Sequence, residues 1–152
     1  MSIKICVDSS VVVKWFKKGG EYEGEALRLR DEVLSSRVSV TICEWVYLEV
    51  VRALVKAEYP KAKVVRAYEI LKEMADLGFI NTVPLHDILE KARDLEIELN
   101  LYSSDAVNLA TAVLSSQNML TEDKHLLREN VRNYLKKLSL KIVRLKEFYS
   151  SF

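Results

Sequence analysis

Short apolar runs alternate with longer amphipathic segments along most of the chain. The runs are rich in β-branched residues and suit buried strands, whereas the longer segments repeat their apolar residues with helical spacing. The expected strands span residues 3–7, 38–42, 79–83, 118–120 and 141–145. The expected helices span residues 11–16, 21–36, 44–57, 60–76, 87–100, 104–116 and 122–138. This alternation predicts an α/β protein in which helices cover both faces of a parallel sheet of four to five short strands.

The length and composition predict one globular domain over residues 1–152. Of the 152 residues, 49% are hydrophobic and 30% are charged, and only four Gly and two Pro interrupt the pattern. The apolar run near the N-terminus is broken at Asp8 and is too short for a signal peptide or a membrane span, so we expect a cytoplasmic protein. Cys6 and Cys43 lack the spacing of a zinc or redox motif and are expected to be buried.

The net charge of +1 hides an uneven distribution. Residues 124–146 contain eight basic residues and one acidic residue, a net charge of +7, so the rest of the chain carries −6. A basic segment can attract a phosphate backbone, although most charged helix faces are simply solvated.

Two acidic residues follow predicted strands. Asp8 comes directly after the first strand, and Asp123 comes three residues after the strand at 118–120. Ligands of parallel α/β sheets bind beyond the carboxyl ends of the strands, where both residues should lie. Each has an alternative explanation, because Asp beside Ser or Thr often caps a helix.

Two further acids lie on predicted helices. Glu49 interrupts an apolar helix face, and burying it unpaired would cost several kcal/mol, so it needs a cation, a strong donor or water. Lys56 or Arg52 could be a structural partner. Asp105 opens the helix at 104–116 and shares a face with Asn108, or else it only complements the helix dipole.

If the four acids converge, they cannot all remain ionised without a compensating charge. Ligands that are all oxygen atoms favour Mg²⁺ or Mn²⁺, and this chemistry suits hydrolysis of a phosphodiester bond. Dehalogenase-type phosphatases need a second Asp two residues after the first, where this chain has Ser10. A metal-dependent adhesion site needs Ser where this chain has Val12.

Four sequence runs together resemble the PIN-domain ribonucleases of the VapC toxin type. In order, they are VDSSVVVKWF, WVYLEVVRAL, LYSSDAVNLATA and LTEDKHL. Each run alone is a weak match, but their order and separations extend the resemblance over nearly the whole chain.

The resemblance implies a three-layer fold and metal-dependent RNA cleavage. It implies that catalysis and metal binding depend on Asp8, Glu49, Asp105 and Asp123. The supporting positions are Ser9, Thr121 and Asn108. It also implies RNA as the substrate, a small antitoxin protein as a partner, and a homodimer.

Several alternatives remain open at this point. Glu44 and Glu122 compete with Glu49 and Asp123, and the Pro that often precedes the second acid in relatives is replaced by Thr41-Ile42-Cys43. A housekeeping RNA-processing nuclease and a PIN-like binding module without catalysis are the alternative functions.

Overall fold

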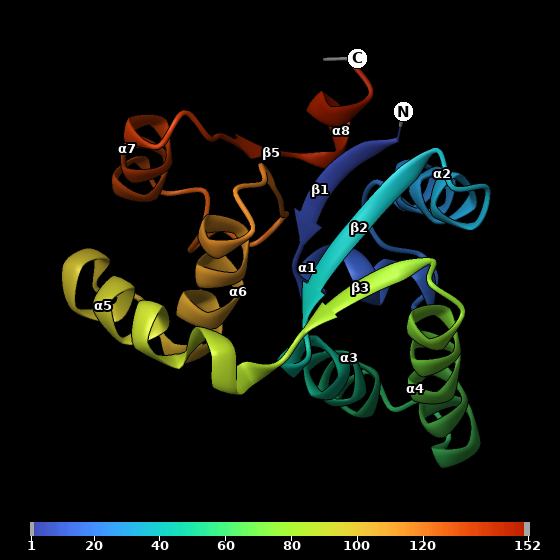
Figure 1. The fold of residues 1–152 in the computed structure, drawn as a ribbon. Coiled ribbons are helices and arrows are strands. Elements are labelled where there is room, and N and C mark those ends of the chain that lie inside the picture. Colours follow the sequence, from blue (N-terminus) through green and yellow to red (C-terminus); the bar gives the residue numbers. More distant parts are fainter. Residues whose placement is uncertain (1, 151–152) are drawn as a thin grey trace.

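The computed structural model describes residues 2–150 and contains one sheet of five parallel strands within them, in the order β3-β2-β1-β4-β5. Figure 1 shows this sheet between two groups of helices. The strands are β1 (Ile3–Val7), β2 (Val38–Cys43), β3 (Ile80–Val83), β4 (Met119–Leu120) and β5 (Ile142–Val143). The predicted α/β class and parallel sheet are confirmed.

The helices also follow the predicted order. The α-helices are α1 (Ser9–Val12), α2 (Glu23–Leu34), α3 (Trp45–Lys56), α4 (Lys61–Asp76), α5 (Leu89–Leu99), α6 (Ser103–Leu114), α7 (Glu129–Lys137) and α8 (Leu145–Phe148). Two 3₁₀ turns, η1 (Val13–Trp15) and η2 (Leu85–Ile88), precede α2 and α5.

Alternate residues of each strand point to opposite faces of the sheet and supply two separate cores. On β1, Ile5 and Val7 join the core that contains apolar residues of α2, α3 and α4, whereas Cys6 joins the core that contains residues of α5, α6 and α7. On β4, Leu120 and Met119 divide in the same way. This alternation explains why the strands read as continuous apolar runs, because both faces are covered.

The region after β4 differs from the prediction. Residues 122–128 are not helical, and α7 begins only at Glu129. The side chain of Glu122 accepts hydrogen bonds from the Arg144 guanidinium at 2.8 Å and from the Leu145 N–H at 2.9 Å. These distant partners hold the segment in an irregular path, which the local helical spacing could not reveal. The last predicted strand is also shorter than expected, and the single turn of α8 follows it.

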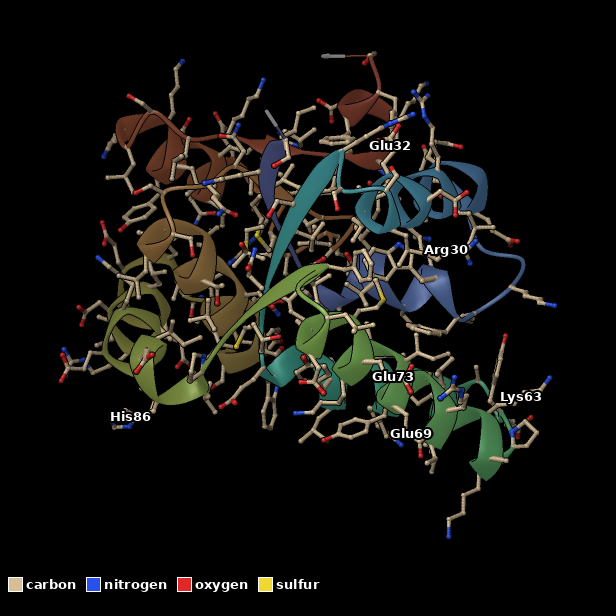
Figure 2. All side chains as sticks on the ribbon, turned by 45° about the vertical axis from the view of Figure 1, so that its right-hand side comes forward. Arg30, Glu32, Lys63, Glu69, Glu73 and His86 are labelled. Carbon is tan, nitrogen blue, oxygen red and sulfur yellow. The ribbon has the colours of Figure 1, made fainter. Side chains whose placement is uncertain are left out.

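Charged side chains lie mainly on the outside of the helical layers. Figure 2 shows Glu69, Glu73 and Lys63 projecting outward from α4, and Arg66 forms surface ion pairs with both glutamates. Within residues 2–150 no helix is both long and apolar enough to cross a membrane.

The packing of α4 gives a direct test of the fold. Leu71 is fully buried and Leu77, just beyond the helix, is 72% exposed. We expect Leu71→Ala to lower the free energy of unfolding by about 2–5 kcal/mol, because it leaves a cavity in the core. We expect Leu77→Ala to change it by less than about 1 kcal/mol. Urea titration of both variants tests the packing, and equal effects would contradict it.

Candidate active site

The carboxyl ends of β1 and β4 are joined through the side chain of Asp8. The strands pair in register at Val7 and Leu120, so the next residues, Asp8 and Thr121, lie side by side. The Thr121 hydroxyl donates to Asp8 Oδ2 at 2.7 Å, and the Ser10 hydroxyl donates to Asp8 Oδ1 at 2.6 Å. Asp8 is therefore fixed from both sides and is only 2% exposed.

Burial raises the pKa of Asp8 to about 7, although its hydrogen bonds with Ser10 and Thr121 lower it in part. The negative charges of Asp123 and Glu49 raise it further. Asp8 occupies the N-cap position of α1, but its side chain makes no capping hydrogen bond. The capping explanation therefore does not account for this carboxylate.

Glu49 is held by residues from two other helices. Its Oε2 accepts from the Ser9 hydroxyl at 3.1 Å and its Oε1 accepts from Asn108 Nδ2 at 2.9 Å. Burial raises its pKa, and these two bonds lower it in part. Neither Lys56 nor Arg52 pairs with it, so the expected alternative of a structural lysine or arginine partner is not observed.

Asp105 and Asp123 form the other side of the site. Asp105 lies in the first turn of α6 and is 5% exposed. Its pKa is raised first by burial, then by the charge of Asp123 and a hydrogen bond with it, and then by the charge of Glu49. The Asp123 N–H donates to Thr121 Oγ1 at 3.0 Å, and Asp123 Oδ1 accepts from the His125 N–H at 2.8 Å. Because α7 begins only at Glu129, Asp123 does not cap it.

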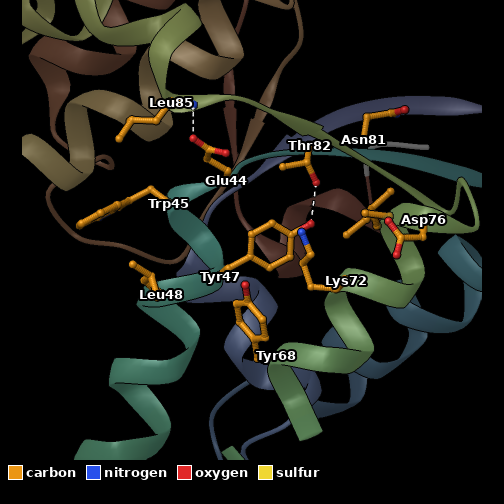
Figure 3. A pocket seen from close by; sticks show the side chains of 12 residues that line it. Glu44, Trp45, Tyr47, Leu48, Tyr68, Lys72, Asp76, Asn81, Thr82 and Leu85 are labelled. Carbon is orange, nitrogen blue, oxygen red and sulfur yellow. Dashed lines mark hydrogen bonds between the residues drawn. The ribbon is translucent and has the colours of Figure 1, made fainter. Parts of the chain in front are cut away.

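The two competing acids have structural partners instead. Glu44 accepts a 2.7 Å hydrogen bond from the Leu85 N–H, drawn in Figure 3, and Glu122 binds Arg144 and Leu145 as described above. Glu44 also lines a cavity of about 710 Å³ between α3, α4 and β3, which none of the four predicted acids lines. The structure thus separates both competing acids from the group around Asp8.

All three predicted supporting residues contact the acids, and two further residues were missed. Ser10 bonds to Asp8 and accepts the Glu122 N–H at 2.9 Å, so it connects β1 to the segment after β4. Arg128 donates to the carbonyls of His125, Leu99 and Asn100, which ties the Asp123 segment to the residues before α6. The pair Ser9-Ser10 beside Asp8 was a usable signal for Ser10, whereas no local pattern marked Arg128.

The donor atoms suit a hard divalent cation. The candidate ligands are carboxylate oxygens, the pKa values of three of these acids are raised, and Asn108 Oδ1 is buried without a hydrogen-bond partner. A divalent ion would stabilise the ionised carboxylates. In the arrangement described for residues 2–150, however, no group of three or more His, Cys, Asp or Glu side chains is placed to hold an ion. The chemistry of the donors fits such an ion, while the carboxylates of Asp8, Glu49 and Asp123 are bound to hydroxyl, amide and backbone donors.

Comparison with known families identifies the class of protein. The PIN domain model matches residues 5–132, and the chain belongs to this family. No curated protein matches the sequence significantly.

Solved structures with the same fold include toxins of the VapC type. The chain is 21% identical to a protein of a toxin–antitoxin complex from Klebsiella pneumoniae, with a TM-score of 0.60 and coverage of 93% of this chain and 97% of the other. The chain is 20% identical to VapC20 of Mycobacterium tuberculosis, a toxin that cleaves the sarcin–ricin loop. The TM-score is 0.62, and the match covers 79% of this chain and 90% of the other. The chain is 13% identical to VapBC2 of Rickettsia felis, a structure bound to promoter DNA. The TM-score is 0.58, and the match covers 93% of this chain and 98% of the other. At these identities the likeness establishes the fold.

The raised pKa of Asp8 predicts how stability depends on pH without divalent ions. Between about pH 4 and pH 7 the folded protein keeps a proton that the unfolded chain releases, so the free energy of unfolding falls as the pH rises. Asp8→Asn should remove the share of this loss that comes from Asp8. Relative to the wild type, it should stabilise the chelator-treated protein at about pH 8 by up to about 4 kcal/mol, but much less at about pH 4.

Urea titration at the two pH values measures this difference. Asp94→Asn on the exposed side of α5 is the matched control and should leave the pH dependence unchanged. Equal pH dependence in the wild type and Asp8→Asn would contradict the buried, protonated state of Asp8.

Proposed function

We propose that the protein is a divalent-metal-dependent endoribonuclease that hydrolyses phosphodiester bonds in RNA. The observation that carries the proposal is the hydrogen-bonded network of acids at the carboxyl edge of the sheet. Asp8, Glu49, Asp105 and Asp123 come from four distant segments. Serine, threonine and asparagine side chains hold the carboxylates of Asp8 and Glu49, Thr121 binds the backbone of Asp123, and Asp105 is hydrogen-bonded to Asp123. The family to which the chain belongs agrees with this chemistry.

The four acids would hold Mg²⁺ or Mn²⁺. A bound ion supplies the positive charge that activates water and stabilises the negative charge developing on the phosphate. Thr121 and Ser10 keep both oxygens of Asp8 in fixed directions, and Asn108 and Ser9 do the same for Glu49. Such positioning limits the reorganisation needed when substrate binds.

We further propose that the enzyme is the toxin of a toxin–antitoxin pair and acts as a homodimer. The support for the toxin role is the likeness to solved toxin–antitoxin proteins that match nearly their whole length. The homodimer is proposed only because the sequence resembles the VapC toxin type. A small antitoxin protein is then its partner. A short reading frame directly upstream of the gene would support this role, while its absence would favour a housekeeping RNA-processing enzyme.

Substitution at the site tests the nuclease function. Asp105→Asn should lower the rate of cleavage of single-stranded RNA in Mn²⁺ at least about a hundredfold, since it removes a ligand charge and even residues behind the ligands commonly contribute ten- to a hundredfold. Asp94→Asn is the control, because it makes the same Asp-to-Asn change at an exposed carboxylate that is paired with Arg93. It should keep the wild-type rate at a temperature where circular dichroism shows both variants folded.

The same assay separates the alternatives. Wild-type cleavage that persists after all divalent ions are chelated would contradict the metal mechanism. RNA binding without cleavage in any divalent ion would favour the binding module. Equal rates for Asp105→Asn and the wild type would remove Asp105 from the active site.

A further inference from the structure

A second cavity, of about 500 Å³, opens directly beside Glu49. Its lining includes Ser9 and Ser104, which neighbour Asp8 and Asp105 in sequence. The remaining lining comes from α3: Trp45, Leu48, Glu49, Arg52, Ala53 and Lys56. We call this cavity the α3 cleft. It therefore runs from the group of acids along one face of a single helix.

The α3 cleft contains two cations without an acidic partner. Arg52 and Lys56 are exposed, and neither takes part in any ion pair of the described residues. Glu49, the acid nearest to them on the helix, is bound by Ser9 and Asn108 instead. A neighbouring group of acids would normally attract such cations. Because Arg52 and Lys56 form no ion pair with these acids, both positive charges are available to an anion in the cleft.

An aromatic side chain lies at the other end of the cleft. Trp45 is 39% exposed, and Figure 3 shows it on the side of α3 away from Tyr47. At a rise of 1.5 Å per residue, Trp45 lies about 6 Å before Glu49 along the helix axis, and Lys56 lies about 10 Å after it. One face of α3 thus carries, in order along the helix axis, an aromatic side chain, a candidate metal ligand and two cations.

We propose that the α3 cleft binds single-stranded RNA next to the bond that is cleaved. Arg52 and Lys56 bind consecutive parts of the phosphate backbone, and Trp45 stacks on an unpaired base. A negatively charged strand fits the two unpaired cations, and stacking on tryptophan requires a base that is not paired in a duplex. This inference rests on the proposed nuclease function and names the surface that holds its substrate.

The salt dependence of RNA binding tests the two cations. With a chelator present to prevent cleavage, a dye-labelled single-stranded RNA of mixed sequence is titrated by fluorescence anisotropy at several salt concentrations. The double variant Arg52→Gln/Lys56→Gln should reduce the slope of log K against log salt by about 1.4, since each phosphate contact on a single strand contributes about 0.7. The matched control Lys136→Gln/Lys137→Gln removes the same charge from the exposed face of α7 and should keep the wild-type slope.

Tryptophan emission tests the stacking contact. The chain has two tryptophans, and Trp15 is 6% exposed, so quenching by added RNA reports mainly on Trp45. We expect RNA to quench the wild type but not Trp45→Phe. Trp45→Ala should weaken binding about tenfold without changing the salt slope, because it removes a stacked base contact and no charge.

The outcomes separate this inference from the proposed function. A reduced slope for the α7 variant and not for the cleft variant would overturn the inference and assign RNA binding to the basic C-terminal segment. Emission of Trp45 that changes with protein concentration but not with RNA would show instead a protein interface at the cleft. In either case, Mn²⁺-dependent cleavage by the wild type would leave the nuclease function intact, whereas absence of both binding and cleavage would overturn both proposals.

Discussion

The hydrogen bond between Thr121 and Asp8 connects residues 113 positions apart and fixes the site to the sheet. It depends on the parallel pairing of β1 with β4, which places the residues after each strand next to each other. From this point Ser10 extends the network to the backbone of Glu122, and Thr121 extends it to the backbone of Asp123. A shift of β4 by one residue would turn Thr121 away from Asp8, so the register of a two-residue strand determines the geometry of the acids.

The site also has a cost in stability. Asp8 and Asp105 are almost completely buried, and burial raises the pKa of both. The hydroxyl donors of Ser10 and Thr121 offset only part of the penalty for removing the Asp8 carboxylate from water. Groups arranged purely for stability would be paired as Glu122 is paired with Arg144, at 2.8 Å. This contrast between acids at the same edge of the sheet supports the proposal that Asp8 and Asp105 belong to a functional site.

The sequence predicted what depends on local pattern and missed what depends on distant partners. The first strand was predicted with its observed bounds, because a β-branched run followed by Asp-Ser-Ser limits both ends. The start of α7 was wrong, because Glu122 and Arg144 determine the path of that segment from 22 residues apart. The partner of Glu49 was left open between lysine, arginine and other donors, and it turned out to be a serine and an asparagine from other helices. No periodicity in one sequence contains that information.

The contacts of the basic residues show which of them are already bound to other groups of the protein. The segment from 124 to 146 is the most basic part of the sequence, yet several of its arginines have structural partners. Arg128 and Arg132 donate to backbone carbonyls, and Arg144 binds Glu122. Arg52 and Lys56 belong to a less basic stretch but have no such partners and lie beside Glu49. Local charge density is therefore a weaker guide to a phosphate-binding surface than the presence of unpaired cations beside the candidate site. A cation already bound to an acid or a carbonyl has part of its charge or some of its donors engaged, and so has less to offer a phosphate.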